Sequence, residues 1–187
     1  MDLLAPENYK DWKFSSTEGS EAGEKSWSLV DGVLSSPGTP TGFIHTGKDF
    51  ENYTLTLEWR WQPGSEGNNS GVLFHVSSAE EAKPWPKSFE AQLQQDNAGD
   101  FWMIGGEKLE GTAKNEGGRW IRVADPKEKP LGEWNTMTVV CKGDTVSVHV
   151  NGTLVNEGKN LSVSKGAIGL QSEGKAIEFR KIVIEEK

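Results

Sequence analysis

Residues 89–96, FEAQLQQD, alternate between apolar and polar side chains. In an extended strand this alternation places Phe89, Ala91 and Leu93 on one face and the polar side chains on the other. The polar set is Glu90, Gln92, Gln94 and Asp96. A row of carboxylate and amide groups can hydrogen-bond successive hydroxyls of a saccharide, and a carboxylate embedded among them could act as a base. A solvated outer face would explain the same pattern, although Lys, Thr or Arg would be more usual there.

Trp85 stands between two prolines, in KPWPK at residues 83–87. Because proline has no amide hydrogen and a fixed φ, this segment cannot lie in the middle of a sheet. The indole ring is then either held outward as a platform for a sugar ring or folded down over the rim of the fold. We predict that Trp85 is partly exposed beside the polar face of residues 89–96.

The histidines and acidic turns give only weak indications of a metal site. His45, His75 and His149 are far apart and lack the local spacing of zinc ligands. We expect His75 to line the site or to be a core histidine. The turn at residues 96–100 offers oxygen ligands to a divalent cation such as Ca²⁺, without the regular spacing of a calcium loop. No cofactor is firmly implied, because the chain lacks phosphate-binding and nucleophile-elbow motifs.

The elements that must position these residues are short strands. Residues 53–62 alternate most clearly and predict a strand buried on one face, whereas 70–76 is apolar on both faces and predicts a central strand. Further strands are expected at 26–30, 33–35, 88–95, 101–104, 120–124, 134–142, 145–150, 153–155, 167–172 and 176–185. The core is expected to contain Leu55, Leu57, Trp59, Val72, Phe74, Val139, Cys141, Val148, Ile168 and Leu170.

The connections between these strands are polar and short. Asp31-Gly32, Gly143-Asp144 and Asn151-Gly152 are typical of tight hairpin turns. A capping-box pattern predicts one helical turn at 78–83, and residues 19–25 and 112–118 are predicted to be loops. Since no linker or repeat interrupts the pattern, we predict an all-β, two-sheet antiparallel β-sandwich that forms a single domain over residues 1–187.

Composition narrows the class of partner. The formal net charge of −8, from 20 basic and 28 acidic residues, disfavours nucleic acid and anionic membrane surfaces. No apolar run is long enough for membrane insertion, and residues 1–6 lack the features of a signal peptide. The 22 glycines and 8 tryptophans suit a turn-rich sandwich that binds a small saccharide or glycoside.

Seven short segments then occur in a fixed order. They are WSLVDGVL at 27–34, NSGV at 69–72, FEAQ at 89–92, GEWN at 132–135, VNG at 150–152, GLQ at 169–171 and EFRKI at 178–182. In this order they resemble the 3-keto-disaccharide hydrolase domain family, which has a concanavalin A-like jelly roll. The resemblance implies an extracytoplasmic bacterial protein, periplasmic or secreted, and we expect residues 1–187 to be its mature form without a signal peptide. It also implies hydrolysis of glycosides whose sugar is oxidised at carbon 3.

Carried over by position, the resemblance places five residues in or beside the site. They are Glu90, Gln92, Gln171, Glu178 and Arg180. The chain departs from the family where His75 replaces a frequent Arg, and where Ser172-Glu173 replaces the usual Asp or His after Gln171.

The expected chemistry is elimination. The related laminarinase-like glucanases carry Glu-x-Asp-x-x-Glu on one strand, whereas residues 90–95 read EAQLQQ, so two carboxylates become amides and double displacement is disfavoured. A ketone at carbon 3 acidifies the proton on carbon 2, so one base can start elimination of the anomeric group before water adds back. We expect Glu90 to be that base, and Arg180 or Arg60 to stabilise the enolate.

Two other functions fit the same sequence. Substrate contacts are expected from Arg60, His75, Trp85, Gln92, Gln94, Asp96, Gln171 and Glu178. A non-catalytic carbohydrate-binding module would use the same face and Trp85 without proton transfer, and a structural or interaction domain would use neither. A buried carboxylate within reach of Arg or His favours an enzyme, whereas an open aromatic shelf favours binding.

Overall fold

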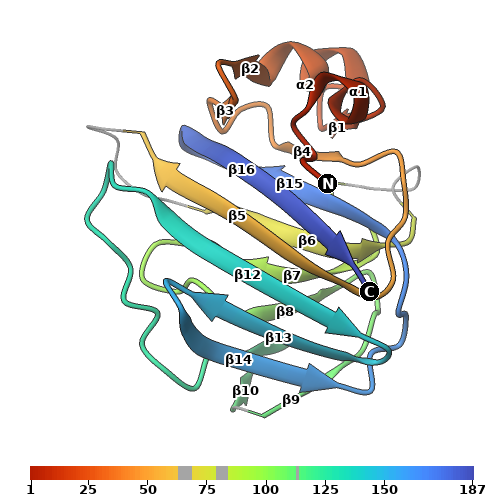
Figure 1. Ribbon diagram of the computed structural model, residues 1–187, viewed down its shortest axis with the longest axis vertical. Helices are drawn as coiled ribbons and strands as arrows, with labels where there is room; N and C mark the ends of the chain where they lie inside the picture. Colours follow the sequence, from red (N-terminus) through yellow and green to blue (C-terminus); the bar gives the residue numbers. More distant parts are fainter. Residues whose placement is uncertain (63–68, 79–83, 113) are drawn as a thin grey trace.

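The computed structural model describes residues 1–62, 69–78, 84–112 and 114–187. Two antiparallel sheets of eight strands each pack face to face, with β16, β5 and β12 crossing in front of β15, β6 and β7 in Figure 1. Sheet I has the order β1 (Lys13–Ser16), β4 (Gly42–His45), β15 (Ala167–Ser172), β6 (Gly71–Val76), β7 (Ser88–Gln92), β8 (Phe101–Ile104), β11 (Arg119–Trp120) and β10 (Asn115–Glu116). Sheet II has the order β2 (Ser28–Val30), β3 (Val33–Ser36), β16 (Ile177–Glu186), β5 (Tyr53–Trp61), β12 (Asn135–Lys142), β13 (Thr145–Val150), β14 (Thr153–Lys159) and β9 (Glu110–Gly111). The predicted two-sheet sandwich is confirmed.

The core lies between the sheets and follows the period of two. Along β5 every second residue is fully buried or nearly so, beginning at Tyr53. All ten predicted core residues have an exposed fraction of 0%. Burial raises the pKa of the Cys141 thiol to about 12, so this cysteine is a core side chain and no nucleophile.

The central strands of sheet I are buried on both faces. Every residue of β4, β6, β7 and β15 is buried, whereas the strands of sheet II alternate between buried and partly exposed residues. The outer face of sheet I, which does not contact sheet II, is therefore also shielded from solvent. Buried polar side chains, among them Glu90, lie on this face. Burial of polar groups is costly unless they are paired, which makes this face the first place to look for a site.

Several predicted boundaries were wrong. Strand β7 ends at Gln92 and β11 covers only Arg119–Trp120. The loop expected at 19–25 and the first residue of the strand expected at 26–30 instead contribute to helix α2 (Ser20–Ser26). A second short helix, α1 (Pro6–Tyr9), lies with α2 at one end of the sandwich (Figure 1). In the described part of the chain, neither helix is long and apolar enough to cross a membrane. The helical turn expected at 78–83 lies largely outside the described residues.

Register shifts typical of β-bulges interrupt the pairing of the described strands at three places, between β6 and β15, between β16 and β5, and between β13 and β14. Three steps along β6, from Leu73 to Val76, match two steps along β15, and His75 at the bulge has a φ of +50°. A matching irregularity lies in β16, where Lys181 also has a φ of +50°. Because a bulge adds one residue to one strand, the side chains beyond it change face relative to the simple pattern.

Candidate functional site

Glu90 occupies the centre of the outer face of sheet I. Its neighbours Phe89 and Ala91 are fully buried in the core, and alternation turns Glu90 to the opposite face, as predicted. The Glu90 side chain is nevertheless only 5% exposed. Its cross-strand neighbours are Leu73 on β6 and Trp102 on β8. A carboxyl group is thus held in a shielded position on a rigid central strand.

Gly71 makes room for this carboxyl group. Gly71 lies beside Gln92 in the register of β6 and β7, and a Cβ at position 71 would lie 2.7 Å from both Cγ and Cδ of Glu90. Real Cβ atoms do not approach other atoms so closely. The Glu90 side chain can therefore fold over the β6 backbone only because residue 71 is a glycine and has no Cβ atom. The motif NSGV therefore has a steric role beside the catalytic candidate.

The surroundings make Glu90 a strong base. Burial, and then the nearby Glu173 carboxylate, raise the pKa of Glu90 to about 8, while a hydrogen bond from the Gln171 side chain lowers it. Within the described residues, neither Glu90 Oε1 nor Gln171 Oε1 has a hydrogen-bond partner. Buried polar atoms left unpaired are uncommon in folded proteins, so these two oxygens need an explanation.

Glu173 forms the second acidic group of this site. Its Oε2 atom accepts a hydrogen bond of 2.8 Å from Asn69 Nδ2, and burial raises its pKa. The adjacent Ser70 hydroxyl donates to the Gln171 carbonyl over 2.9 Å, which ties β6 to β15 at this point. Glu173 is thus held by Asn69 close enough to Glu90 for its charge to raise the pKa of the Glu90 carboxyl group.

Gln92 closes the strand instead of extending a polar row. Its Oε1 atom accepts hydrogen bonds of 2.8 Å from the backbone N–H groups of both Leu93 and Gln94. These bonds turn the chain, and Asp96 follows with a φ of +67°. The expected alternation to Asp96 was therefore wrong, and Gln94 and Asp96 lie in the turn after β7, away from the row that contains Glu90.

A buried ion cluster flanks the site and was missed by sequence reasoning. Asp100 is fully buried, and its Oδ1 atom accepts hydrogen bonds from the Arg122 backbone N–H at 2.8 Å and from Arg122 Nη1 at 3.2 Å. Arg119 Nη1 lies 3.6 Å from Asp100 Oδ2. In the register, Arg119 is opposite Trp102, which is opposite Glu90, so all three share one face.

The sequence offered one indirect signal for this cluster. Residues 101–104 were predicted as a strand, and their alternation would have set Trp102 on the face of Glu90. Nothing local indicated that β11 pairs with β8, because β11 has only two residues and lies 15 residues further along the chain.

Trp85 lies on the same face, as predicted from its flanking prolines. It is partly buried and packs against a small apolar cluster on the outer face of sheet I, separate from the main core. The cluster contains Phe43, Leu73, Val76 and Ala167, with Ile104 at its margin. Since Leu73 is the cross-strand neighbour of Glu90, the indole ring and the carboxyl group stand on adjoining parts of one surface.

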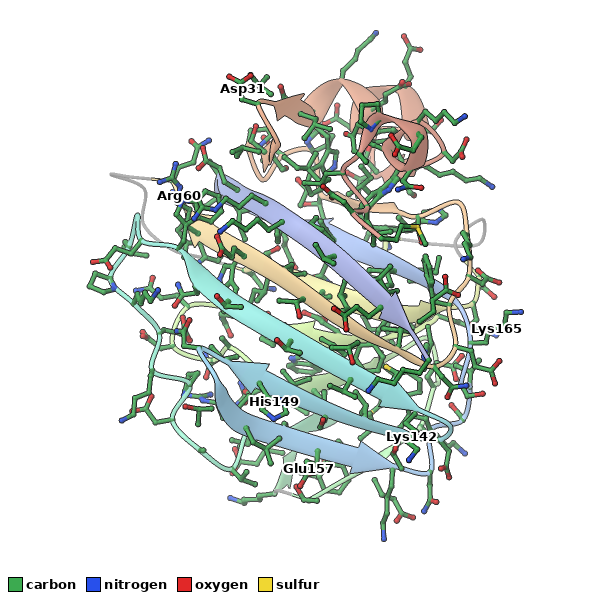
Figure 2. The ribbon with its side chains drawn as sticks, viewed as in Figure 1. Asp31, Arg60, Lys142, His149, Glu157 and Lys165 are labelled. Atoms are coloured by element: carbon green, nitrogen blue, oxygen red, sulfur yellow. The ribbon has the colours of Figure 1, made fainter. Side chains whose placement is uncertain are left out.

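The predicted cationic partners of Glu90 lie elsewhere. Arg60 lies on β5 of sheet II, as labelled in Figure 2, and Arg180 lies on β16 of the same sheet. Arg60 Nε donates to Glu178 Oε2 at 2.6 Å. Arg180 Nε bonds Glu58 Oε2 at 2.5 Å. These side chains project from the sheet opposite to that of Glu90, so the structure does not bring Arg60, Glu178 or Arg180 to the site.

His75 is also not part of the outer face. Its exposed fraction is 0%, and its ring makes edge contacts with Tyr53 and Phe89 of the core. The Nδ1 atom is 3.1 Å from the Val163 carbonyl. Simple alternation from Phe74 would have turned His75 outward, and the bulge turns it inward instead. The core-histidine interpretation is therefore the one that its position supports.

The described residues contain no group of three or more His, Cys, Asp or Glu side chains arranged to hold a metal ion. The acidic turn that offered ligands to Ca²⁺ contributes its Asp100 to the arginine cluster. The Asp96 carbonyl also accepts from Arg122. The Asp100 carboxylate and the Asp96 carbonyl thus both accept hydrogen bonds from Arg122, unlike the oxygen ligands of a calcium site.

The chain is similar over nearly its whole length to known carbohydrate-active proteins. The model of the 3-keto-alpha-glucoside-1,2-lyase-like domain matches residues 5–185. A candidate glycosyl hydrolase from Parabacteroides distasonis is 24% identical, with a TM-score of 0.71 over 100% of this chain and 98% of that chain. No curated protein gives a significant match.

Two further solved structures share the fold at low identity. The carbohydrate-binding module CBM66 from Bacillus subtilis is 14% identical, with a TM-score of 0.67 over 94% of this chain and 96% of that chain. A β-glucanase from Bacillus licheniformis is 10% identical, with a TM-score of 0.64 over 100% of this chain and 96% of that chain. The sandwich is therefore one that both enzymes and binding modules use, and the site must separate the two.

Proposed function

The chain belongs to the 3-keto-alpha-glucoside-1,2-lyase-like family, and on this premise we propose that it cleaves 3-keto-glycosides with Glu90 as the base. The observation that carries the proposal is the Glu90 carboxyl itself. It is 5% exposed, has one oxygen without a partner, and has a pKa raised to about 8. A carboxylate of that basicity is suited to removing a proton next to a ketone.

The reaction has two half-steps. The Glu90 carboxylate takes the proton from carbon 2, and the C2–H electron pair forms the enolate, with its negative charge on the oxygen at carbon 3. The enolate then reforms the ketone, its electron pair becomes the C1–C2 double bond, and the bond from carbon 1 to the leaving oxygen breaks. The departing alkoxide takes a proton from the now neutral Glu90 or from water. Addition of water at carbon 1 and return of a proton to carbon 2 then give the free 3-keto sugar.

Negative charge develops on the ketone oxygen during proton removal, and Arg119 is the cation best placed to meet it. Two strand spacings, about 10 Å, separate β11 from β7, and Trp102 of β8 lies between Arg119 and Glu90 in the register. The guanidinium is held by Asp100 at 3.6 Å and remains 26% exposed. This assignment replaces Arg60 and Arg180 as the stabilising group.

A carbohydrate-binding module is the second candidate, because Trp85 is half-buried on an apolar surface beside Glu90. Such a module needs the aromatic surface and has no need of an ionisable base. The two functions therefore differ in what they require of residue 90.

Replacement of Glu90 by Gln tests the proposal. The change keeps shape and hydrogen bonding but removes the base, so Glu90→Gln should lower turnover of a 3-keto-glucoside by about a hundredfold or more. Binding of the same compound, measured by calorimetry, should change far less.

The matched control is Glu178→Gln, which removes a carboxylate of sheet II and should leave turnover within about twofold of the parent. Unchanged turnover in Glu90→Gln would reject the base assignment. Absence of turnover in the parent protein, together with retained binding, would favour the binding module.

A further inference from the structure

A second hollow opens at the β1 edge of sheet I. It has a volume of about 760 Å³ and is formed where β4 and β6 end and where β1 and β15 begin. Polar side chains line much of it, among them Lys13, Ser15, His45, Asp49 and Lys165. The volume falls within the range of pockets that hold small molecules.

This hollow lies on the same face as Glu90 but at a distance from it. The register runs from His45 through Gly169 and Leu73 to Glu90, which is three strand spacings or about 14 Å. Val76 and Ala167 belong both to the wall of the hollow and to the apolar cluster beneath Trp85. A continuous surface therefore connects the hollow to the candidate site, while the two remain separate in position.

The hollow has an excess of positive charge. Lys13 and Lys165 are both exposed and line it, and in the described part of the chain neither has an ion-pair partner. Among the described residues that line the hollow, Asp49 is the one acidic side chain. The described residues that line the hollow therefore carry a net positive charge, although the chain as a whole has a formal charge of −8.

His45 adds a neutral acceptor. Its Nδ1 atom is 2.9 Å from the Thr46 carbonyl, which can only accept, so Nδ1 carries the hydrogen. Burial, with a smaller contribution from Lys13, lowers the pKa of His45, and the ring is therefore neutral at pH 7. Nε2 then has a free lone pair that can accept a hydrogen bond from a hydroxyl group.

We propose that this hollow is a second saccharide site, selective for a sugar residue that bears an anionic group. The anion, a carboxylate or a phosphate or sulfate ester, faces Lys13 and Lys165, while a ring hydroxyl donates to His45 Nε2. The site is independent of the reaction at Glu90, since none of its lining residues takes part in proton transfer.

Binding of simple sugars tests this proposal. Glucuronate and glucose 6-phosphate, added separately to the ¹⁵N-labelled protein, should shift the amide resonances of residues 13, 45 and 165. Glucose should bind at least tenfold more weakly than either, and added salt should weaken the two anionic sugars because it screens exposed charges. The difference between glucuronate and glucose 6-phosphate distinguishes a carboxylate site from a phosphate site.

Lysine variants distinguish binding at this hollow from non-specific electrostatic attraction of the anionic sugar to surface lysines. Lys13→Gln and Lys165→Gln should each weaken glucuronate binding by about threefold to tenfold. The matched control is Lys142→Gln, an exposed lysine at the end of β12 in sheet II and apart from Lys165 in Figure 2, which should have no effect.

Three results would overturn the proposal: equal binding of glucose and glucuronate, equal loss in the Lys142 control, or inorganic phosphate binding as tightly as the sugar phosphate. Glu90→Gln should leave glucuronate binding unchanged. A failure of the base assignment therefore remains distinguishable from a failure of this site.

Discussion

The outer faces of the two sheets carry polar side chains in the same alternating pattern, but these side chains are satisfied in different ways. On sheet II, Glu58 bonds both Arg180 and Lys181, and the guanidinium of Arg180 lies 4.1 Å from the centre of the Trp134 ring. On sheet I, Glu90 is more deeply buried and keeps an oxygen without a partner. Paired charges stabilise a surface, whereas a shielded, unpaired carboxyl group costs stability and supplies reactivity.

The pKa shifts of the two carboxyl groups have opposite signs. Burial alone would raise the pKa of Glu58, but its bonds to Lys181 and Arg180 lower it overall. The pKa of Glu90 is raised to about 8. The same residue type on the same period of two thus contributes to stability on one face and opposes it on the other.

The largest expected effect is on stability at high pH. Between pH 4.5 and 8 the folded protein keeps the Glu90 proton while the unfolded chain loses it, so stability falls as pH rises through this window. Glu90→Gln cannot ionise and should therefore be more stable than the parent by about 2–5 kcal/mol at pH 9, with no such gain below pH 4. Urea unfolding at both pH values measures this. A variant that is less stable than the parent at pH 9 would contradict the raised pKa.

Glu58→Gln provides the opposite case on sheet II. Because the folded-state pKa of Glu58 is lowered, its contribution is present above the unfolded-state pKa and is lost as pH falls through the folded-state value. The variant should be less stable than the parent by about 1 kcal/mol at pH 7, and the difference should disappear near pH 3. If Glu90→Gln and Glu58→Gln changed the stability in the same direction at pH 9, the two carboxyl groups would not contribute to stability with opposite signs.

Gly71→Ala tests whether the backbone of β6 sets the position of Glu90. The added methyl group would overlap Cγ and Cδ of Glu90, displace the carboxyl group and lower turnover by about tenfold or more, with the sheet content unchanged by circular dichroism. Gly23→Ala in α2, where the nearest atom would be 3.4 Å away, is the control and should retain full activity. Full activity in Gly71→Ala would mean that the observed position of Glu90 is not the active one.

Trp134→Ala should have the smallest effect. It removes the ring contacted by Arg60 at 4.5 Å and Arg180 at 4.1 Å, which should cost about 1 kcal/mol of stability and leave turnover within twofold. Thermal unfolding and steady-state rates measure both quantities. A tenfold loss of turnover at unchanged stability would place the sheet II face in the site.

The sequence was sufficient to predict the sandwich, its core and the outward direction of Glu90. These follow from a period of two, which is a local property of the chain and is preserved wherever a strand is regular. Trp85 could be located by equally local reasoning, because two prolines exclude its segment from a sheet ladder.

Long-range pairing and bulges could not be read in the same way. Arg180 was expected near Glu90 because the family resemblance places it there by position. Alternation shows that its side chain faces away from the core but does not say which sheet contains β16. For His75 two positions stayed open, lining the site or lying in the core, because nothing in residues 71–76 indicates the bulge that turns it inward. The cluster of Asp100, Arg119 and Arg122 depends on the pairing of β11 with β8. The strand predicted at 120–124 indicated neither that pairing nor its start at Arg119.

The central claim is that Glu90 removes the proton from carbon 2 of a 3-keto-glucoside. Its most direct test is the exchange of that proton for deuterium in heavy water, followed by NMR at a series of pH values. We predict exchange that rises with pH, with a midpoint near the Glu90 pKa of about 8, and that falls by about a hundredfold in Glu90→Gln. Exchange that is independent of pH between 6 and 9, or equal in the parent and the variant, would contradict it.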